Sequence, residues 1–341
     1  MGEVPLLYID RELPAGVGEL AAGRCTFCGP EPAALATATG VVAGASRWDG
    51  ARLDGAPHVR VISRTGVGYD NVDVDAATER KIVVCTAPDA PTVSTAEHTI
   101  ALILAAAKRL VPNQLRLRAA TGDYVQVNDG LELDGRTLGL VGYGRIARRV
   151  HRAASALDMQ VIAHDPYLEE PRGSAAGRSR SEAVREPGGA RRPWEDGSGR
   201  RGDRTVELVD LDELFARADV ISLHAPLTPE TRHVIDATAF AAMRPGVVFV
   251  NAARGGLVDH DALLDALDSG PVGAASLDVT EPEPLPPDHP LLHRDDVIVT
   301  PHIASATDAG RLRLYQHAID NAIAVLAGGQ PSFVVNPEVL P

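Results

Sequence analysis

The sequence predicts an α/β protein whose parallel, doubly wound sheets are arranged in two domains. Short apolar runs alternate with helical segments along most of the 341 residues, as expected for parallel strands joined by helices. A glycine-rich turn near the middle of the chain begins a second series of such units. A chain of this length is sufficient for about two domains.

The first series of units occupies the first hundred residues. Apolar runs predict strands at 6–9, 41–43, 59–62 and 82–84, and helical segments are expected at 31–39 and 74–80. Because this series precedes the glycine-rich turn, it predicts a separate sheet with a task of its own.

Two long helices are expected to connect the domains. The first spans 94–109, with Ser94 or Thr95 as N-cap and Pro112 closing it, and the second spans about 305–326. The second domain would therefore be inserted into the first. The predicted boundaries are 1–108 together with 306–341 for the first domain, and 109–305 for the inserted one.

The glycine-rich turn follows a short apolar run, Leu138 to Val141. Gly142 permits a tight turn from strand to helix, Gly144 lets the backbone approach a pyrophosphate, and the small Ala147 allows the helix to pack closely on the strand. Amides at the start of that helix, and its positive dipole end, would hold the phosphates. The strand, turn, small residue and helix occur in register and favour a dinucleotide-binding unit over an ordinary turn.

An acidic residue ends the second strand of this unit. Asp165 lies 21 positions after Gly144, near the expected interval of about 20 for a carboxylate that binds the ribose diol. A carboxylate there repels a 2′-phosphate and favours NAD over NADP. Residues 169–205 follow and contain almost no aliphatic side chains, which predicts a disordered surface insertion. One alternative stays open, in which an arginine of the insertion reaches a 2′-phosphate and relaxes the cofactor choice.

Further strands are expected at 219–224, 247–251, 273–278 and 296–300, with a helix at 261–268. Four side chains that could take part in binding or catalysis follow the ends of these strands. Arg254 suits a bidentate grip on a carboxylate, Glu281 and Glu283 offer carboxylates, and His302 is a proton carrier. Each alone has an ordinary structural explanation, such as an ion pair or a hydrogen bond. Together, downstream of the glycine turn, they predict an active site.

Composition narrows the class of partner. The net charge of −13 argues against nucleic acid held by a general basic surface, but leaves room for a small anionic substrate. No apolar run approaches the ~20 residues of a membrane span, and no secretory signal is evident, so a cytoplasmic protein is expected. Cys25 and Cys28 have no second pair or histidine cluster to complete a metal site, and no disulfide framework or metal is expected.

Nearly the whole chain outside the insertion resembles the D-isomer-specific 2-hydroxyacid dehydrogenases, a family that includes phosphoglycerate dehydrogenase. The resemblance is carried by residues 141–146, 222–228, 251–255, 278–284 and 301–304, and by 64–71 near the start. It implies two Rossmann-like or flavodoxin-like domains, with an NAD-binding domain inserted into a substrate domain. It also implies a homodimer formed through the cofactor domain. The implied reaction is hydride transfer between NAD and C2 of a small D-2-hydroxy or 2-oxo acid, such as phosphoglycerate, hydroxypyruvate or glyoxylate.

The resemblance also implies roles for individual residues. Arg254 would bind the substrate carboxylate, Glu283 would support the acid/base His302, and Glu281 would be a nearby decoy. The loop with Val67 and Gly68 would hold the same carboxylate through its amides, and Arg64 could meet a second anionic group or be structural. The residues implied in cofactor binding are Gly142, Gly144, Arg145, Ile146, Asp165, Ala225, Pro226, Ala252, Ala253, Asp278, His302 and Ala304.

Two departures from the family pattern are visible. Thr280 stands where an aromatic residue is frequent, and the sequence ends soon after residues 334–337, so the regulatory domains of long phosphoglycerate dehydrogenases are expected to be absent. The second departure weakens the case for 3-phosphoglycerate as substrate. An alternative function on the same fold is an NAD(H)-responsive binding protein similar to transcriptional corepressors.

Overall fold

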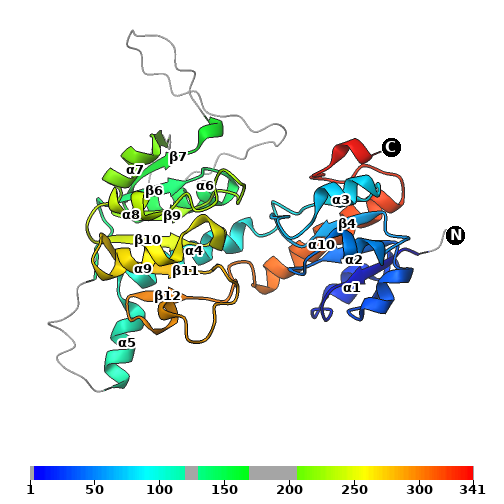
Figure 1. The fold of residues 1–341 in the computed structure, drawn as a ribbon, viewed down its shortest axis with the longest axis horizontal. Coiled ribbons are helices and arrows are strands. Elements are labelled where there is room, and N and C mark those ends of the chain that lie inside the picture. The colour runs from blue at the N-terminus through cyan, green and yellow to red at the C-terminus, as the bar shows by residue number, and fades with distance from the viewer. Residues whose placement is uncertain (1–3, 120–129, 169–205, 341) are drawn as a thin grey trace, which may run out of the picture.

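The computed structural model describes residues 4–119, 130–168 and 206–340. Its strands form two sheets, one of five strands in the order β2-β1-β3-β4-β5 and one of seven in the order β12-β11-β10-β9-β6-β7-β8. All strand pairs in both sheets are parallel. The two sheets and their helices lie side by side, and both termini lie on the five-stranded side (Figure 1). The predicted α/β class with two parallel sheets is confirmed.

The five-stranded sheet is built from the two ends of the chain. Its elements are β1 (Leu6–Ile9), α1 (Val17–Ala21), β2 (Thr26–Cys28), the 3₁₀ helix η1 (Pro32–Thr37), β3 (Gly40–Ala43), α2 (Gly50–Asp54), β4 (Val61–Arg64), α3 (Val74–Glu79), β5 (Val83–Cys85), α10 (Asp308–Leu326) and η5 (Pro337–Val339). One face of the sheet is covered by α10, where Ile319 and Ala322 pack against Leu7 and Val61. Near the end of the chain, Asn336 accepts a hydrogen bond of 2.7 Å from the Val84 amide. This sheet is therefore covered on that face only when the segment from Asp308 onward is in place.

The seven-stranded sheet is formed by the middle of the chain. Its elements are α4 (Thr92–Ala107), α5 (Leu110–Arg118), β6 (Thr137–Val141), α6 (Arg145–Ser155), β7 (Gln160–His164), η2 (Pro166–Leu168), β8 (Glu207–Leu208), α7 (Leu211–Arg217), β9 (Val220–Leu223), α8 (Ala237–Ala241), β10 (Val247–Asn251), η3 (Gly255–Leu257), α9 (His260–Asp268), β11 (Val272–Leu277), η4 (Pro290–His293) and β12 (Val297–Val299). Two apolar clusters cover its two faces, one beneath α7, α8 and α9 and the other beneath α4 and α6. The predicted insertion at 169–205 lies outside the described residues.

The first long helix differs from its prediction in two respects. Its N-cap is Pro91 rather than Ser94 or Thr95, and both of those side chains are buried within the helix. Moreover, Ile103 and Ala106 pack with Leu140 in the core of the seven-stranded sheet. The predicted boundary at residue 108 placed this helix in the first domain, whereas its packing places it with the second sheet.

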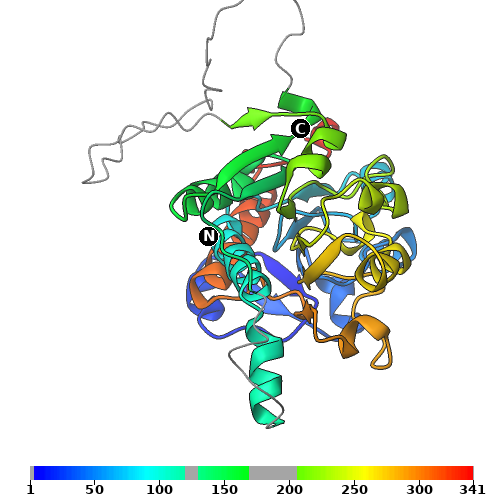
Figure 2. The same ribbon diagram turned by 90° about the vertical axis from the view of Figure 1, so that its left-hand side faces the viewer.

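Pro112 does not end the helical region, contrary to the prediction. Arg109 takes a left-handed backbone conformation with φ 54°, which ends α4 and redirects the chain. Helix α5 then begins at Leu110, and Pro112 lies in its first turn, where a missing amide hydrogen costs nothing. Helix α5 projects from the body in both views (Figures 1 and 2). Its Leu110 and Leu117 are 57% and 62% exposed.

The two segments that connect the sheets are hydrogen-bonded to each other. The Ser94 hydroxyl in α4 lies 2.8 Å from the hydroxyl of Thr307, the N-cap of α10. Arg313 of α10 donates a hydrogen bond of 3.2 Å to the Ala90 carbonyl. The two segments that connect the sheets, at the start of α4 and at the start of α10, are therefore held together by hydrogen bonds. Within the described ranges, no helix is both long and apolar enough to cross a bilayer.

Candidate functional site

The glycine turn lies where the strand order of the seven-stranded sheet reverses. From β6 the chain proceeds to β7 and β8 on one side, and then to β9 and beyond on the other, and such a reversal is where ligands of open α/β sheets bind. Gly142 has φ 89°, and a Cβ on it would lie 2.8 Å from the Ala225 amide nitrogen. Only glycine fits here without strain. Pro226 follows Ala225 at the same strand end.

The start of α6 suits a phosphate ligand. A Cβ on Gly144 would meet nothing within 4 Å, so the space beside this turn is open. No side chain caps the helix, whose first residues are Arg145 and Ile146, and the first amides of a helix have no acceptor within it. This combination of open space and uncapped amides fits a pyrophosphate.

Asp165 is held against the same turn. One carboxylate oxygen accepts a hydrogen bond of 2.9 Å from the Tyr143 amide, and the other accepts one of 3.0 Å from the Tyr167 amide. Each oxygen keeps a second lone pair for another donor. The carboxylate is thus fixed where the sequence predicted a partner for a ribose diol, and the donor and acceptor set of the turn fits a dinucleotide.

Arg145 links the glycine turn to the other sheet. Its Nε lies 2.7 Å from an oxygen of Asp89, and its guanidinium lies 5.5 Å from the centre of the Phe333 ring. Both partners belong to segments next to the five-stranded sheet. The sequence indicated a cofactor contact for Arg145 but not this bridge between the sheets.

His302 and Glu283 form a close pair. The Nδ1 atom of His302 lies 2.6 Å from Oε1 of Glu283. His302 has a left-handed backbone with φ 53°, and its amide donates a hydrogen bond of 2.8 Å to the Asp278 carbonyl. Glu281 instead accepts a hydrogen bond of 2.9 Å from Arg232. The geometry therefore distinguishes the two glutamates in the way the sequence motif indicated.

Asp278 anchors the loop that carries His302. Its carboxylate is 1% exposed and accepts hydrogen bonds from the Thr300 hydroxyl (2.6 Å) and from the amides of Ile303 and Ala304 (2.9 Å each). The imidazole of His98, from α4, lies 3.3 Å away. Burial alone would raise the pKa of Asp278, but these hydrogen bonds lower it overall.

The buried Asn251 fixes the backbone turn that carries Arg254. Asn251, at the end of β10, donates a hydrogen bond of 2.8 Å to the Arg254 carbonyl and accepts one of 3.0 Å from the Ala253 amide. Together with Ala252 this makes a short turn that points Arg254 toward the five-stranded sheet. There its Nε donates a hydrogen bond of 3.1 Å to Asp70.

The loop after β4, which contains Val67 and Gly68, contacts the Arg254 side chain. A Cβ on Gly68 would collide with the Arg254 guanidinium, so the two are in direct contact. The amides of Val67 and Gly68 donate to no acceptor within the described chain and can therefore serve a ligand. Burial alone would raise the pKa of Asp70, but the charge and hydrogen bond of Arg254 lower it overall.

The segments with Arg254 and Glu283 pack directly on each other. A Cβ on Gly255 would collide with the backbone of Thr280, so only glycine allows this approach. Thr280, the departure from the family pattern, is buried, and its hydroxyl donates a hydrogen bond of 2.9 Å to the Pro282 carbonyl. The predicted arginine, glutamate and histidine therefore converge along one edge of the seven-stranded sheet, facing the other sheet.

The sequence profile described as "D-isomer specific 2-hydroxyacid dehydrogenase, NAD binding domain" matches residues 100–186 and 193–304, more than half of the chain. The chain belongs to the D-isomer-specific 2-hydroxyacid dehydrogenases. It is 40% identical over 274 residues to D-3-phosphoglycerate dehydrogenase of Archaeoglobus fulgidus, covering 80% of this chain and 46% of that protein. It is 38% identical over 291 residues to glyoxylate reductase of Thermofilum pendens, covering 84% and 78%.

A solved dehydrogenase structure has the same overall fold. D-lactate dehydrogenase from Aquifex aeolicus, described as complexed with NAD and lactic acid, superposes with a TM-score of 0.75 at 27% identity, covering 95% of this chain and 96% of that one. The chain spans about half the length of the phosphoglycerate dehydrogenase it matches. The seven-stranded unit thus corresponds to the residues that match the family's NAD-binding domain.

Some residues of this candidate site were not identified from the sequence. Asp70 contacts Arg254, and His98 contacts Asp278, in each case from a segment far away in the chain. Asp70 follows Gly68 closely in sequence, whereas nothing in the sequence distinguishes His98, which lies within α4. His224 lies in the motif at 222–228, and its Nε2 is 3.1 Å from the Ser222 hydroxyl. Burial lowers the pKa of His224 to about 4, so this ring is neutral at physiological pH.

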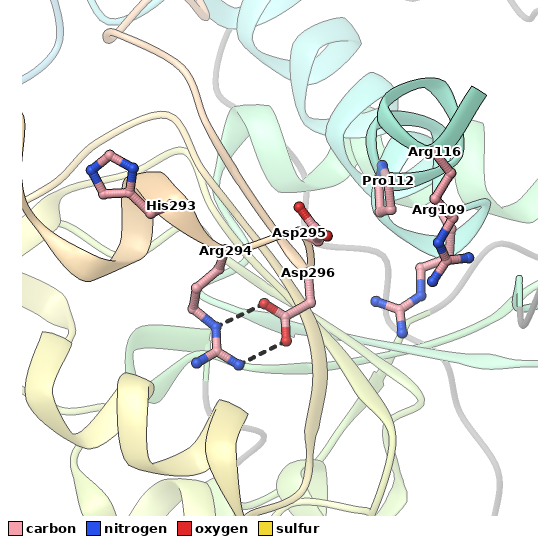
Figure 3. A pocket seen from close by; sticks show the side chains of 7 residues that line it. All are labelled: Arg109, Pro112, Arg116, His293, Arg294, Asp295 and Asp296. Atoms are coloured by element: carbon pink, nitrogen blue, oxygen red, sulfur yellow. Dashed lines mark hydrogen bonds and ion pairs between the residues drawn. The ribbon is translucent and has the colours of Figure 1, made fainter. Parts of the chain in front are cut away.

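A pocket of about 350 Å³ lies elsewhere, between α5 and the segment before β12. Figure 3 shows its lining, in which Arg294 grips Asp296 through two hydrogen bonds of 2.8 and 2.9 Å, with Arg109 and Arg116 on the opposite wall. None of the predicted site residues lines this pocket. It is therefore separate from the candidate site.

Proposed function

We propose that the protein is an NAD-dependent D-2-hydroxyacid dehydrogenase that interconverts a small 2-oxo acid and its D-2-hydroxy acid. The observation that carries this proposal is the His302–Glu283 pair, held at 2.6 Å on a segment that packs against the turn carrying Arg254. A proton donor, His302, and a side chain that can bind a carboxylate, Arg254, thus lie at the same edge of the seven-stranded sheet. The glycine turn that fits a dinucleotide lies next to them. The family relatives named glyoxylate reductase and D-lactate dehydrogenase support the same class of reaction.

Arg254 and the amides of Val67 and Gly68 would orient the substrate carboxylate. The Nη2 group of Arg254 is available for this purpose, because Asp70 takes Nε and the Ala253 carbonyl takes Nη1. Bound NADH supplies a hydride to C2 of the 2-oxo acid. His302 would donate a proton to the substrate oxygen through Nε2, since Nδ1 is turned to Glu283. Such general acid catalysis contributes roughly 10²–10⁴-fold.

Gly142, Gly144, Arg145, Ile146, Asp165, Ala225, Pro226, Ala252, Ala253, Asp278 and Ala304 would line the cofactor site. We propose NAD rather than NADP because the Asp165 carboxylate, fixed by two amides, would repel a 2′-phosphate. The proposed domains are residues up to about 91 together with 308–340 for substrate binding, and the segment between them for the cofactor. This moves the boundary from 108, since α4 packs on the seven-stranded sheet. Closure of the two over the substrate would exclude water.

We further propose a cytoplasmic homodimer formed through the cofactor domain. The projecting helix α5 supports this assembly, because Leu110, Leu115 and Leu117 are exposed on it and a partner would cover them. The three cysteines are unpaired, which fits a reducing compartment. Light scattering tests the assembly, and a Leu117→Arg variant is expected to shift the protein toward monomer. A wild type that is monomeric at micromolar concentration contradicts it.

Turnover of NADH with a panel of 2-oxo acids tests the activity. Hydroxypyruvate, glyoxylate, pyruvate and phosphohydroxypyruvate would be compared, with His302→Ala expected to lose most of kcat while keeping NADH affinity. The matched control is His317→Ala, on α10 and outside the proposed site. Binding of NADH without turnover of any 2-oxo acid would refute the enzyme proposal and favour a cofactor-responsive binding protein.

A further inference from the structure

The segment that carries Glu283 has few hydrogen bonds of its own. Residues 280–284 lie between β11 and η4, and Pro282 and Pro284 have no amide hydrogen to donate. Within the described part of the chain, the amides of Glu281 and Glu283 donate to no acceptor. The Pro282 carbonyl accepts a hydrogen bond from within the segment. The position of Glu283 therefore depends on side chains that reach the segment from other elements.

His260, the first residue of α9, reaches this segment from a buried position. Its Nδ1 donates a hydrogen bond of 3.1 Å to the Glu281 carbonyl. The residue is 7% exposed, and its Nε2 is buried without a hydrogen-bond partner in the described ranges. Burial lowers the pKa of His260, so the ring is neutral at physiological pH. Because an unpaired buried nitrogen costs free energy, burial alone does not favour histidine over an apolar residue at this position.

Helix α9 does not need the His260 side chain in order to begin. The N-cap is Asp259, whose carboxylate accepts hydrogen bonds of 3.0 and 3.1 Å from the amides of Asp261 and Ala262. These bonds satisfy two of the helix's first amides. The hydrogen bond of His260 instead goes to a residue 21 positions away. Its effect is therefore to join α9 to the segment after β11.

The Glu281 side chain is held from a third element, but more weakly. Arg232, in the segment between β9 and α8, donates a hydrogen bond of 2.9 Å to its carboxylate, and Nε2 of His233 lies 3.6 Å from the same oxygen. The side chains of Arg232, His233 and Glu281 are all exposed. Exposed ion pairs contribute little to stability because water competes for both charges. The buried hydrogen bond of His260 is therefore the stronger constraint on this segment.

We infer that His260 is a positioning residue for the proposed reaction, because it fixes the Glu281 carbonyl and thereby sets where Glu283 meets His302. Glu283 follows Glu281 by two positions, and its carboxylate lies 2.6 Å from Nδ1 of His302. A shift of the Glu281 backbone would move that contact. The inference rests on the proposed function, since it assumes that His302 transfers the proton.

Two substitutions of His260 test whether the bond from Nδ1 matters. His260→Asn places a side-chain amide near the position of Nδ1, whereas His260→Gln places it near Nε2. With NADH and the preferred 2-oxo acid, the Asn variant is expected to keep most of kcat. The Gln variant is expected to lose about tenfold to a hundredfold in kcat, the range for a small displacement at a reacting group. KM for both substrates should change little, because Arg254 and the glycine turn lie on other segments. Both variants bury an amide, so loss through misfolding would affect both.

A second background shows whether His260 acts through Glu283. In a Glu283→Ala protein there is no carboxylate to position, so adding His260→Gln should no longer lower kcat. The matched control is His293→Leu, because His293 donates a hydrogen bond of 2.9 Å to the Pro287 carbonyl farther along the same connection, and kcat should stay at the wild-type value.

Three results overturn the positioning role of His260. They are a wild-type kcat in the Gln variant, an Asn variant that loses as much as the Gln variant, and an equal loss from His260→Gln with and without Glu283. A wild-type protein that reduces none of the 2-oxo acids refutes the proposed function, and this inference with it.

Discussion

Replacing Asp278 by Asn should both destabilise the protein and impair the proposed reaction. The carboxylate of Asp278 accepts hydrogen bonds from Thr300, Ile303 and Ala304 and lies 3.3 Å from His98. An amide offers one acceptor oxygen in place of two and places an NH₂ group against a buried backbone donor. Losing one charge-assisted bond costs ~1.5–3 kcal/mol, and the donor left unpaired adds ~1–3 kcal/mol. A loss of ~3–5 kcal/mol in unfolding free energy is therefore expected.

The same substitution should lower activity because the anchored loop carries His302. A displacement of the order of 1 Å at a reacting group can cost about 100-fold in rate, and kcat/KM for the preferred 2-oxo acid should fall by at least that factor. Urea unfolding and steady-state kinetics measure the two effects. Since the pKa of Asp278 is lowered, wild type should keep this stabilisation above pH ~4 and lose it only as the pH falls through the folded value.

A matched substitution distinguishes this anchor from a general effect of losing a carboxylate. Asp236 caps α8 by accepting a hydrogen bond of 2.9 Å from the Ala239 amide, and asparagine caps helices about as well as aspartate. Asp236→Asn should therefore change stability by less than ~0.5 kcal/mol and leave kinetics intact. If Asp278→Asn behaves like this control, the reasoning about the loop is wrong.

Three further changes have distinct expected outcomes. Gly68→Ala should raise KM for the 2-oxo acid about tenfold or more, since the new methyl group displaces Arg254. The melting temperature should stay close to that of wild type, because the methyl group clashes only with a flexible side chain. Gly142→Ala should cost ~2 kcal/mol and abolish tight NADH binding in a fluorescence titration, given the positive φ and the backbone of Ala225 nearby; unchanged affinity would contradict the proposed cofactor site. Because burial lowers the pKa of His224 to about 4 and unfolded histidine titrates near 6.5, stability should decline by up to ~3 kcal/mol as the pH falls from about 6.5 to 4, and His224→Gln should flatten that dependence in pH-resolved unfolding.

Features with a local cause were predictable from the sequence. The turn at Gly142 needs a positive φ and a close approach, and both requirements select glycine at fixed spacings from a strand and a helix. The motif around Glu283 and the histidine motif are likewise short and sit at strand ends. Their proximity follows from parallel strands ending at one edge. The catalytic and binding roles assigned to these residues stay predictions.

Features that depend on how the two sheets meet were not predictable. The pairing of Arg254 with Asp70 joins positions 184 residues apart and requires the edges of both sheets to face each other. The sequence also does not indicate which of the two sheets α4 packs on, because small and apolar residues occupy much of the helix surface and suit either sheet. The prediction that Pro112 ends the helical region was wrong because proline is compatible with the first turn of a helix as well as with a helix end.

The unit around the five-stranded sheet takes residues from both ends of the chain, and this has a consequence for biosynthesis. Its core needs α10 and Asn336, which leave the ribosome some 250 residues after the strand they contact. Until then, the face of β1, β3 and β4 that carries Leu7, Val42 and Val61 lacks α10, and Val17 and Ala21 of α1 cover only part of it. The two apolar clusters of the seven-stranded sheet come from residues 96–299 alone, so we expect that segment to fold while it is being synthesised. We therefore expect the amino-terminal unit to complete its core last, whereas the amino-terminal domain usually folds first.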